Sequence, residues 1–204
     1  MQNMAVFRRD TRSGAAGWLG LIAVVLLLGL LAVIVLGWYI GYYNRAVRLQ
    51  EDVQKAWGDV DAVLTRRFDL VPNLVNTVKG YAAHEKEVFE KITAARAKYN
   101  AAATVGEKAA IAAEFDRALV NVLAIAEANP QLRASENFRD LQVQLEGTEN
   151  RIAVARTRYN EAVKELNSFC RSFFGRFFCE RAKVGPAEYY QAPQITREAP
   201  RVEF

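Results

Sequence analysis

Residues 138–173 read FRDLQVQLEGTENRIAVARTRYNEAVKELNSFCRSF, and this stretch decides the fold. Apolar and small side chains recur along it at alternating steps of three and four residues, which is the period of one face of an α-helix. That face consists of Phe138, Leu141, Leu145, Thr148, Ile152, Ala155, Tyr159, Ala162, Leu166, Phe169 and Phe173. One long helix cannot bury such a stripe by itself, so it needs partner helices along its length.

The sequence before this stretch supplies those partners, because residues 44–128 show the same helical period and no segment reads as a strand. Pro72 interrupts the first helix, since proline removes an intrahelical donor, and Asp69 is the expected cap of the next segment. Thr104 followed by Glu107 predicts a capping box at the start of a later helix. The predicted fold class is all-α, an elongated antiparallel bundle of long helices with coiled-coil-like packing over residues 44–171.

A membrane-spanning helix is predicted over residues 14–43, which contain no charged side chain. At about 1.5 Å per residue this run reaches roughly 45 Å, enough to cross the hydrocarbon core. Aromatic residues at both ends, Trp18 on one side and Trp38 to Tyr43 on the other, suit the two interfaces with water. A cleaved signal peptide is the alternative, but its apolar region is only roughly 7–15 residues long. The chain is therefore expected to cross the lipid bilayer once, after a short basic tail over residues 1–13.

The side of the membrane on which the bundle lies stays open at this stage. Basic residues flank the apolar run on both sides, and the positive-inside rule counts Lys and Arg near its ends. They are Arg8, Arg9 and Arg12 before it and Arg45, Arg48 and Lys55 after it.

Composition excludes several classes of function. The net charge is +4, and residues 1–43 contribute +2 of it, which leaves 4 − 2 = +2 for the rest of the chain. That is too small for a nucleic-acid-binding surface. One histidine and two cysteines do not make a typical zinc site, and no glycine-rich nucleotide motif is present. We expect no cofactor, no metal, no catalytic residues and no nucleic-acid partner.

Charged residues gather at two places beside the apolar stripes. Arg66, Arg67 and Asp69 precede Pro72, and the spacings of Glu146, Glu149 and Arg156 place these three near one face of the last long helix. Paired carboxylates can do acid–base chemistry, whereas Arg–carboxylate pairs can fix the register of packed helices. We favour the structural interpretation, because no nucleophile or phosphate-binding loop accompanies the cluster. Arg66 or Arg67 is expected to pair with Glu146 or Glu149.

The carboxy-terminal part begins with an aromatic amphipathic extension over residues 172–181. Its phenylalanines continue a helical stripe, which suits the bundle core, a membrane interface or another subunit. They are Phe173, Phe174, Phe177 and Phe178, after Phe169. Cys170 and Cys179 would be about 13.5 Å apart along an unbroken helix, so free thiols are expected unless Gly175 breaks it. Residues 182–204 hold three prolines and little apolar content, which predicts a disordered tail.

Several of these segments also resemble a known family. After Trp57 the motifs are RRFDLVPNLV (66–75), VKGY (78–81), HE (84–85), ENF (136–138), LEGTENRI (145–152) and ARTRYN (155–160). In this order they are similar to the LemA family of bacteria, over residues from about 43 to 167. The resemblance implies one amino-terminal membrane helix, an antiparallel helical bundle and no established activity. The family's Phe-Pro-Ser-like end of the last helix is absent, because Asn167 is followed by SFCRSFFGRFFC.

These observations lead to a functional expectation. The chain is expected to be a non-enzymatic scaffold of the bacterial cell membrane that contacts copies of itself and neighbouring membrane proteins. The alternatives are a signal transducer or enzyme that uses Arg66, Glu146 and Glu149, and a membrane-remodelling assembly. The candidate interaction residues are Arg66, Arg67, Asp69, Glu146, Glu149, Arg156, Phe173, Phe174, Phe177 and Phe178.

Overall fold

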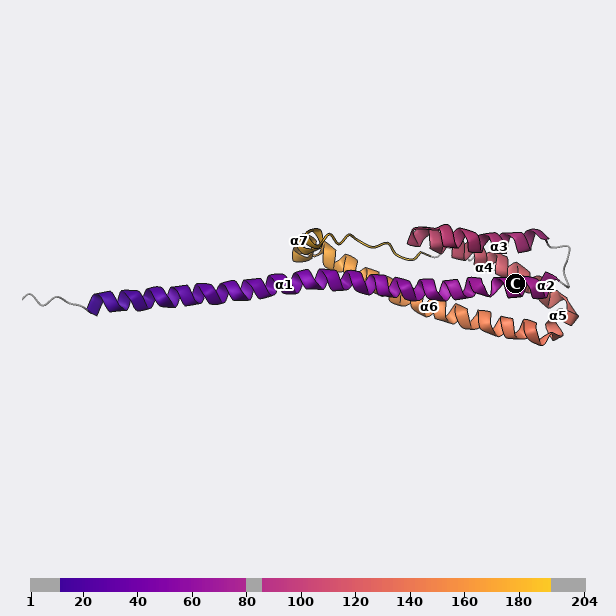
Figure 1. Ribbon diagram of the computed structural model, residues 1–204, viewed down its shortest axis with the longest axis horizontal. Helices are drawn as coiled ribbons and strands as arrows, with labels where there is room; N and C mark the ends of the chain where they lie inside the picture. Colours follow the sequence, from indigo (N-terminus) through magenta and orange to yellow (C-terminus); the bar gives the residue numbers. More distant parts are fainter. Residues whose placement is uncertain (1–11, 80–85, 192–204) are drawn as a thin grey trace, which may run out of the picture. The chain divides into compact units, whose positions relative to one another are not determined.

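The computed structural model describes residues 12–79 and 86–191, and every regular element within them is a helix (Figure 1). The helices are α1 (Arg12–Asp69), α2 (Val71–Lys79), α3 (Lys86–Ala101), α4 (Val105–Ala128), α5 (Pro130–Ala134), α6 (Glu136–Arg171) and α7 (Phe173–Ala182). These ranges confirm the all-α prediction. The chain divides into two compact units, Met1–Arg45 and Ala46–Phe204.

The first unit contains the apolar part of α1. Its most apolar window of 18 residues has a mean hydropathy of 3.3, and none of that window is buried. A fully exposed apolar surface of this length is unfavourable in water and suits the hydrocarbon of a bilayer. Of the predicted basic tail, residues 1–11 lie outside the described part of the chain.

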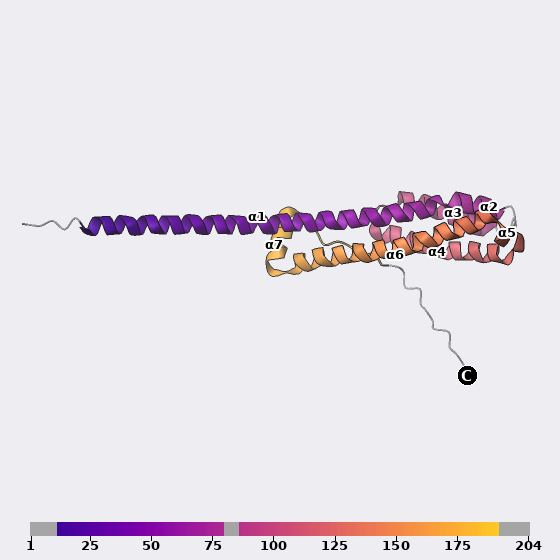
Figure 2. The same ribbon diagram turned by 90° about the horizontal axis from the view of Figure 1, so that it is seen from below.

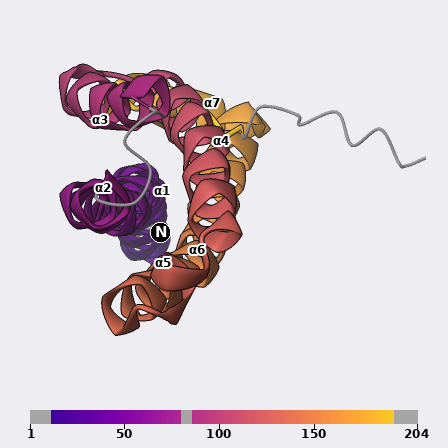
Figure 3. The same cartoon turned by 90° about the vertical axis from the view of Figure 1, so that its right-hand side faces the viewer.

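The second unit is the predicted bundle, in which α6 runs back along α1 and α2 (Figure 2). Two contacts define the antiparallel register. Arg67 pairs with Glu149, and the rings of Trp57 and Tyr159 lie 5.5 Å apart. Seen end-on, α3, α4 and α6 surround α2 and the bundle part of α1 on three sides (Figure 3).

The core of the bundle follows the predicted stripes. Phe68 of α1 lies 4.7 Å from Tyr99 and 4.5 Å from Phe115, measured between ring centroids. One position on α6 differs from the prediction, because Val163 is fully buried and Ala162 is only half-buried. A helix of 3.6 residues per turn drifts away from a strict three–four alternation over so long a run.

The predicted helix boundaries are found with one correction. Pro72 coincides with a break, since α1 ends at Asp69 and α2 begins at Val71. Asp69 is not a cap, because it is the last residue of α1 and its Oδ1 accepts a 2.7 Å hydrogen bond from Arg96. The capping box at Thr104 is confirmed: its Oγ1 accepts from the backbone N–H of Glu107 at 3.1 Å, and the Glu107 carboxylate accepts from the Thr104 N–H.

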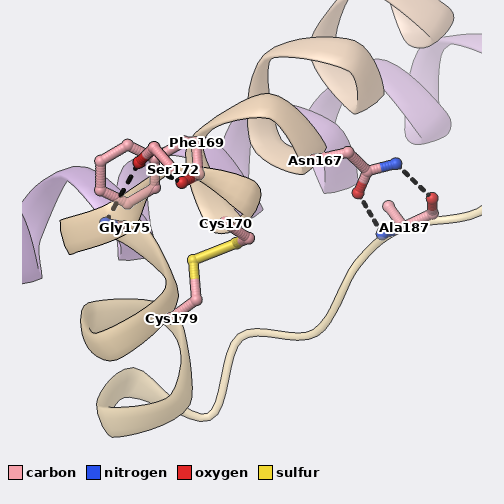
Figure 4. Close-up of a disulfide and its surroundings, with 7 residues drawn as sticks. All are labelled: Asn167, Phe169, Cys170, Ser172, Gly175, Cys179 and Ala187. Atoms are coloured by element: carbon pink, nitrogen blue, oxygen red, sulfur yellow. Dashed lines mark hydrogen bonds between the residues drawn. A yellow bond between two sulfur atoms is a disulfide. The ribbon is translucent and has the colours of Figure 1, made fainter.

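The prediction of free thiols is wrong, because Cys170 and Cys179 form a disulfide with their Cα atoms 5.7 Å apart (Figure 4). The helix is not continuous between them. Ser172 adopts an extended conformation, and its Oγ accepts from the Gly175 N–H at 3.1 Å, which starts α7 in a new direction. A Cβ at Gly175 would lie 1.8 Å from the Phe169 carbonyl oxygen, so only glycine fits this turn.

The predicted phenylalanine stripe is divided by the same turn. Phe169 and Phe178 are buried. Phe173 is 88% exposed, Phe177 56% and Phe174 48%. The five rings therefore do not form one continuous face, because the two helices that carry them point in different directions.

The predicted disordered tail needs a correction over the described residues 182–191. Residues 182 and 183 complete the end of α7, and residues 184–191 lie along α6 as an extended segment, which we call the strap. Val184 and Tyr190 of the strap are buried. Hydrogen bonds from α6 side chains to the strap backbone replace the apolar contacts that the composition lacks. Residues 192–204 lie outside the described part of the chain.

Candidate functional site

The centre of the site is Arg67, the last arginine of α1 before the break between α1 and α2. Its side chain is only 9% exposed and lies between three helices. One guanidinium nitrogen is 3.2 Å from Asp116 of α4, and another pairs with Glu149 of α6. The guanidinium carbon also lies 5.9 Å from the centre of the Phe115 ring. This arrangement confirms that one of the two arginines pairs with Glu149.

The two carboxylates are more exposed than the arginine that they share. The Asp116 side chain is 45% exposed and the Glu149 side chain 56%. Partial burial raises the pKa of Asp116, and the nearby Glu149 raises it further, while Arg67 acts in the opposite direction. The cluster therefore holds one buried cation between two carboxylates, and burial disfavours the ionised form of Asp116.

Arg156 and Tyr190 extend the cluster towards the strap. The Arg156 guanidinium carbon lies 4.7 Å from the centre of the Tyr190 ring, a cation–π contact. Burial raises the pKa of Tyr190, and Arg156 acts to lower it. The Nε atoms of Arg67 and Arg156 are both buried without a hydrogen-bond partner. Tyr190 thus connects the carboxy-terminal strap to the charged centre of the bundle.

A second polar cluster joins α1, α3 and α4. Asp61 Oδ1 accepts a 2.8 Å hydrogen bond from the Tyr99 hydroxyl and a 2.6 Å bond from Lys108 Nζ. The Lys108 ammonium also lies 4.9 Å from the Tyr99 ring centre. Burial acts to raise the pKa of Asp61, but the hydrogen bonds from Lys108 and Tyr99 outweigh it, and the pKa is lowered. This cluster holds the charged form of Asp61 at a helix junction.

Two asparagines of α6 bind the strap by its backbone. Asn167 donates to the Ala187 carbonyl and accepts from the Ala187 N–H, both at 2.9 Å (Figure 4). Asn160 makes the same pair of bonds with Tyr190, at 3.2 and 2.9 Å. The seven helical residues from Asn160 to Asn167 span about 10.5 Å, and the three extended residues from Ala187 to Tyr190 span about 10 Å. The spacing of the two asparagines therefore matches the spacing of the two strap residues that they bind. Tyr159 adds a 2.7 Å bond from its hydroxyl to the Glu188 carbonyl.

The remaining predicted residues lie elsewhere. Arg66 and Glu146 are exposed, and neither is among the Arg67 contacts described above. Asp69 pairs with Arg96 of α3. Phe173, Phe174 and Phe177 are exposed on α7, whereas Phe178 is buried. Functional candidates that the sequence analysis missed are Asp61, Lys108, Asp116, Asn160, Asn167 and Tyr190.

The three grooves described on the bundle surface lie away from the Arg67 cluster. Three surface grooves border α2 and α6, α2 and α3, and α1 and α6, and none of them is lined by Arg67, Asp116 or Glu149. Within the described residues, no group of three His, Cys, Asp or Glu side chains is placed to hold a metal ion. The Arg67 guanidinium is enclosed by α1, α4 and α6, whereas the Asp116 and Glu149 side chains that pair with it are 45% and 56% exposed.

The chain is similar to a known protein family and to individual bacterial proteins. The model of the LemA family matches residues 56–204. Magnetosome protein MamQ 2 of Paramagnetospirillum magneticum is 24% identical over 175 residues, covering 73% of this chain and 64% of the relative. Protein LemA of Metamycoplasma hominis is 23% identical over 160 residues, covering 78% of this chain and 73% of the relative. This chain therefore spans less than two thirds of the length of that MamQ protein.

Proposed function

Because the chain belongs to the LemA family, we propose that it is a non-enzymatic, membrane-anchored helical scaffold that acts through protein contacts, first of all with copies of itself. The observation that carries this proposal is the position of Arg67. Its buried guanidinium lies between α1, α4 and α6 and pairs with two partly exposed carboxylates, which would fix the register of the three helices. Such a rigid bundle suits a protein that presents surfaces to partners.

The apolar helix supports the anchoring part of the proposal. Its exposed side chains and mean hydropathy suit a single pass through a bacterial cell membrane. Alkaline carbonate extraction of membranes tests this part. The full-length chain is expected in the membrane pellet, and its release into the supernatant would contradict a membrane-spanning anchor.

The disulfide supports a location for the bundle on the oxidising side of the membrane. Disulfides persist outside the cytoplasm and are rare where thiols are kept reduced. With Cys170 and Cys179 on that side, Arg8, Arg9 and Arg12 would lie in the cytoplasm and Arg45, Arg48 and Lys55 outside it, an equal split that the positive-inside rule does not decide. Denatured chain from cells quenched in acid is expected to react with maleimide–polyethylene glycol only after reduction. Labelling of both cysteines without reduction would place the bundle in a reducing compartment.

A groove between α1 and α6 is the proposed surface for self-association. It has a volume of about 500 Å³, and Ala62, Val63 and Val154 contribute apolar surface to it. Val154 is 51% exposed. Asp59 stands on the α1 side, and Arg151 and Arg158 on the α6 side. A second copy related by two-fold symmetry would place acidic and basic sides together, which is how self-complementary interfaces pair.

Native mass spectrometry of the full-length chain in detergent tests the self-association. A defined oligomer is expected, and Val154→Glu should dissociate it by placing an unpaired charge in an apolar contact. The matched control is Val120→Glu on α4, where the native valine is 64% exposed. A chain that is monomeric at every concentration would contradict the proposal, as would equal effects of the two substitutions.

Two alternative functions, a signal transducer or enzyme and a membrane-remodelling assembly, predict different experimental outcomes. A signal transducer or enzyme that uses Arg66, Glu146 and Glu149 would lose its signalling or catalytic activity in Glu149→Gln without losing its fold. A membrane-remodelling assembly would form a large lattice in place of a small oligomer. Crosslinking in cells would identify neighbouring membrane proteins that contact the bundle.

A further inference from the structure

The short helix α7 has an apolar ridge that points away from the bundle. Gly175, Phe178 and Cys179 form its buried side. Phe173 and Phe177 are one helical turn apart, on the opposite side, and are 88% and 56% exposed. Large apolar side chains with this exposure are costly in water, so the ridge calls for an apolar environment.

Basic side chains border this ridge on both sides. At 100° per residue, Arg176 and Arg181 lie on either side of the line through Phe173 and Phe177. Arg171 and Lys183, which flank the two ends of α7, are also exposed. The exposed acidic residue Glu180 lies on the same side of α7, between Arg176 and the line through Phe173 and Phe177. Four cations against one anion around an aromatic ridge is the pattern of a helix that lies on an anionic lipid surface.

The register of α6 against α1 places α7 at the end of the bundle where the second unit begins, near Ala46. Arg67 pairs with Glu149 and Trp57 contacts Tyr159, so facing positions on α1 and α6 have numbers that add to 216 in both cases (67 + 149 and 57 + 159). The same register puts Cys170 level with Ala46, the first residue of the second unit. Ala46 follows Tyr43, the last residue of the uncharged run, by three residues, and three residues reach at most about 10 Å. This limit on the distance along the chain does not depend on the direction of the apolar helix.

From these observations we propose that α7 is a membrane-surface element, whose Phe173 and Phe177 enter the interface while Arg176 and Arg181 contact anionic lipid headgroups. The disulfide to Cys170 and the turn at Ser172 hold this helix at a fixed angle to α6. The proposal rests on the proposed membrane anchor but not on self-association. It assigns α7 to a second contact with the bilayer, which limits how the bundle can tilt.

A lipid surface fits this ridge better than a protein partner does. A stable protein interface buries about 800 Å² on each partner. Aromatic side chains bury roughly 150–250 Å² each when fully enclosed, so the partly exposed phenylalanines of one ten-residue helix do not reach that area. A bilayer needs no matching surface, and the three residues from Tyr43 to Ala46 leave only a short connection between the apolar helix and this end of the bundle.

Fluorescence quenching in nanodiscs that hold one copy of the full-length chain tests the proposal. An environment-sensitive fluorescent amino acid replaces Phe177, and spin-labelled lipids act as quenchers in phosphatidylcholine discs with or without phosphatidylglycerol. Strong quenching is expected with phosphatidylglycerol. Arg176→Gln combined with Arg181→Gln should lower the ratio of bound to free helix by roughly 30-fold. The matched control carries the same fluorophore at Val120, which is also exposed.

The outcomes separate the possible occupants of the ridge. Quenching at position 177 no stronger than at position 120 would overturn the proposal, because the ridge would then lie in water. Protection of the fluorophore only in discs with two copies would also overturn it, because a second chain would be the occupant. Retention of the chain in discs shows that the anchor holds, so a failure of the α7 proposal is distinguishable from a failure of the anchor.

Discussion

Arg67 of α1 and Glu149 of α6 form an ion pair although they are 82 positions apart in the chain. Asp116 of α4 shares the same guanidinium at 3.2 Å. The cation is buried, whereas both carboxylates remain partly hydrated. The cost of removing a carboxylate should therefore depend on whether the other one remains to neutralise Arg67.

We predict strong non-additivity in this cluster. Asp116→Asn alone should change the free energy of unfolding by less than about 1 kcal/mol, because burial already disfavours its ionised form and Glu149 still neutralises Arg67. Asp116→Asn together with Glu149→Gln should cost about 3–5 kcal/mol, since Arg67 is then a buried charge without a partner. Chemical unfolding of the full-length chain in detergent measures both. Additive losses would contradict the shared cation, and Arg67→Met should abolish the effect of the double change.

A pH dependence is predicted for the cluster around Asp61. Its folded-state pKa is lowered below the ordinary value of 3.8. Between the folded-state pKa and pH 3.8, the unfolded chain therefore binds more protons than the folded chain. The stabilisation is present above pH 3.8 and is lost as the pH falls through the folded-state pKa. Asp61→Asn should be less stable than the native chain at neutral pH, and the difference should shrink in acid. Lys108→Met should show the same trend, and a pH-independent difference would contradict it.

The sequence predicted the features that depend on local pattern. The break at Pro72 and the capping box at Thr104 need only neighbouring residues, and the long stripe on α6 needs only its period. The partners of charged groups were predicted in part: Glu149 was expected, but Asp116 was not. Its contact with Arg67 depends on how α4 is placed against α1, and no period within one helix contains that information.

At the carboxy-terminal end, the local sequence pattern led to wrong predictions. The periodicity of the phenylalanines suggested a continuing helix, but one hydrogen bond from the Gly175 N–H to Ser172 redirects the chain. The low apolar content of the last residues suggested disorder, because composition measures only hydrophobic driving force. The amide side chains of Asn160 and Asn167 bond the backbone of the strap, and such bonds leave no compositional signal.

Gly175 is predicted to be intolerant of any side chain. In Gly175→Ala the added methyl would meet the Phe169 carbonyl oxygen, so the turn must open, at a cost of roughly 1–3 kcal/mol or more. The opened turn should separate the two sulfur atoms, so that the disulfide does not form during folding, and thiol labelling without reduction should then detect Cys170 and Cys179. Gly147→Ala on α6 is the matched control, because its added methyl meets nothing within 4 Å. That change should stabilise the helix by about 0.5–1 kcal/mol, and equal thiol exposure in both variants would refute the steric explanation.

The last prediction concerns the strap, which should open as one unit. Asn160 and Asn167 each hold one strap residue by a donor and an acceptor bond, and their spacing along α6 matches the spacing of Ala187 and Tyr190. Losing either asparagine therefore removes two bonds, worth about 1 kcal/mol each. The other contacts of the strap are the Tyr159 hydrogen bond and the burial of Val184 and Tyr190. Hydrogen exchange at the amides of Ala187 and Tyr190 should accelerate by roughly 10- to 30-fold in Asn167→Ala.

Cooperativity is the specific claim, since the amide of Tyr190 is bonded to Asn160 and not to the substituted residue. Asn167→Asp should act like the alanine variant, because its second carboxylate oxygen would face the Ala187 carbonyl that the native amide donates to. Asn150→Ala is the control on the same helix, as Asn150 is exposed. If only the Ala187 amide exchanges faster, the two asparagines hold separate contacts. Tyr190 would then stay over Arg156, and the charged cluster would keep its cover without Asn167.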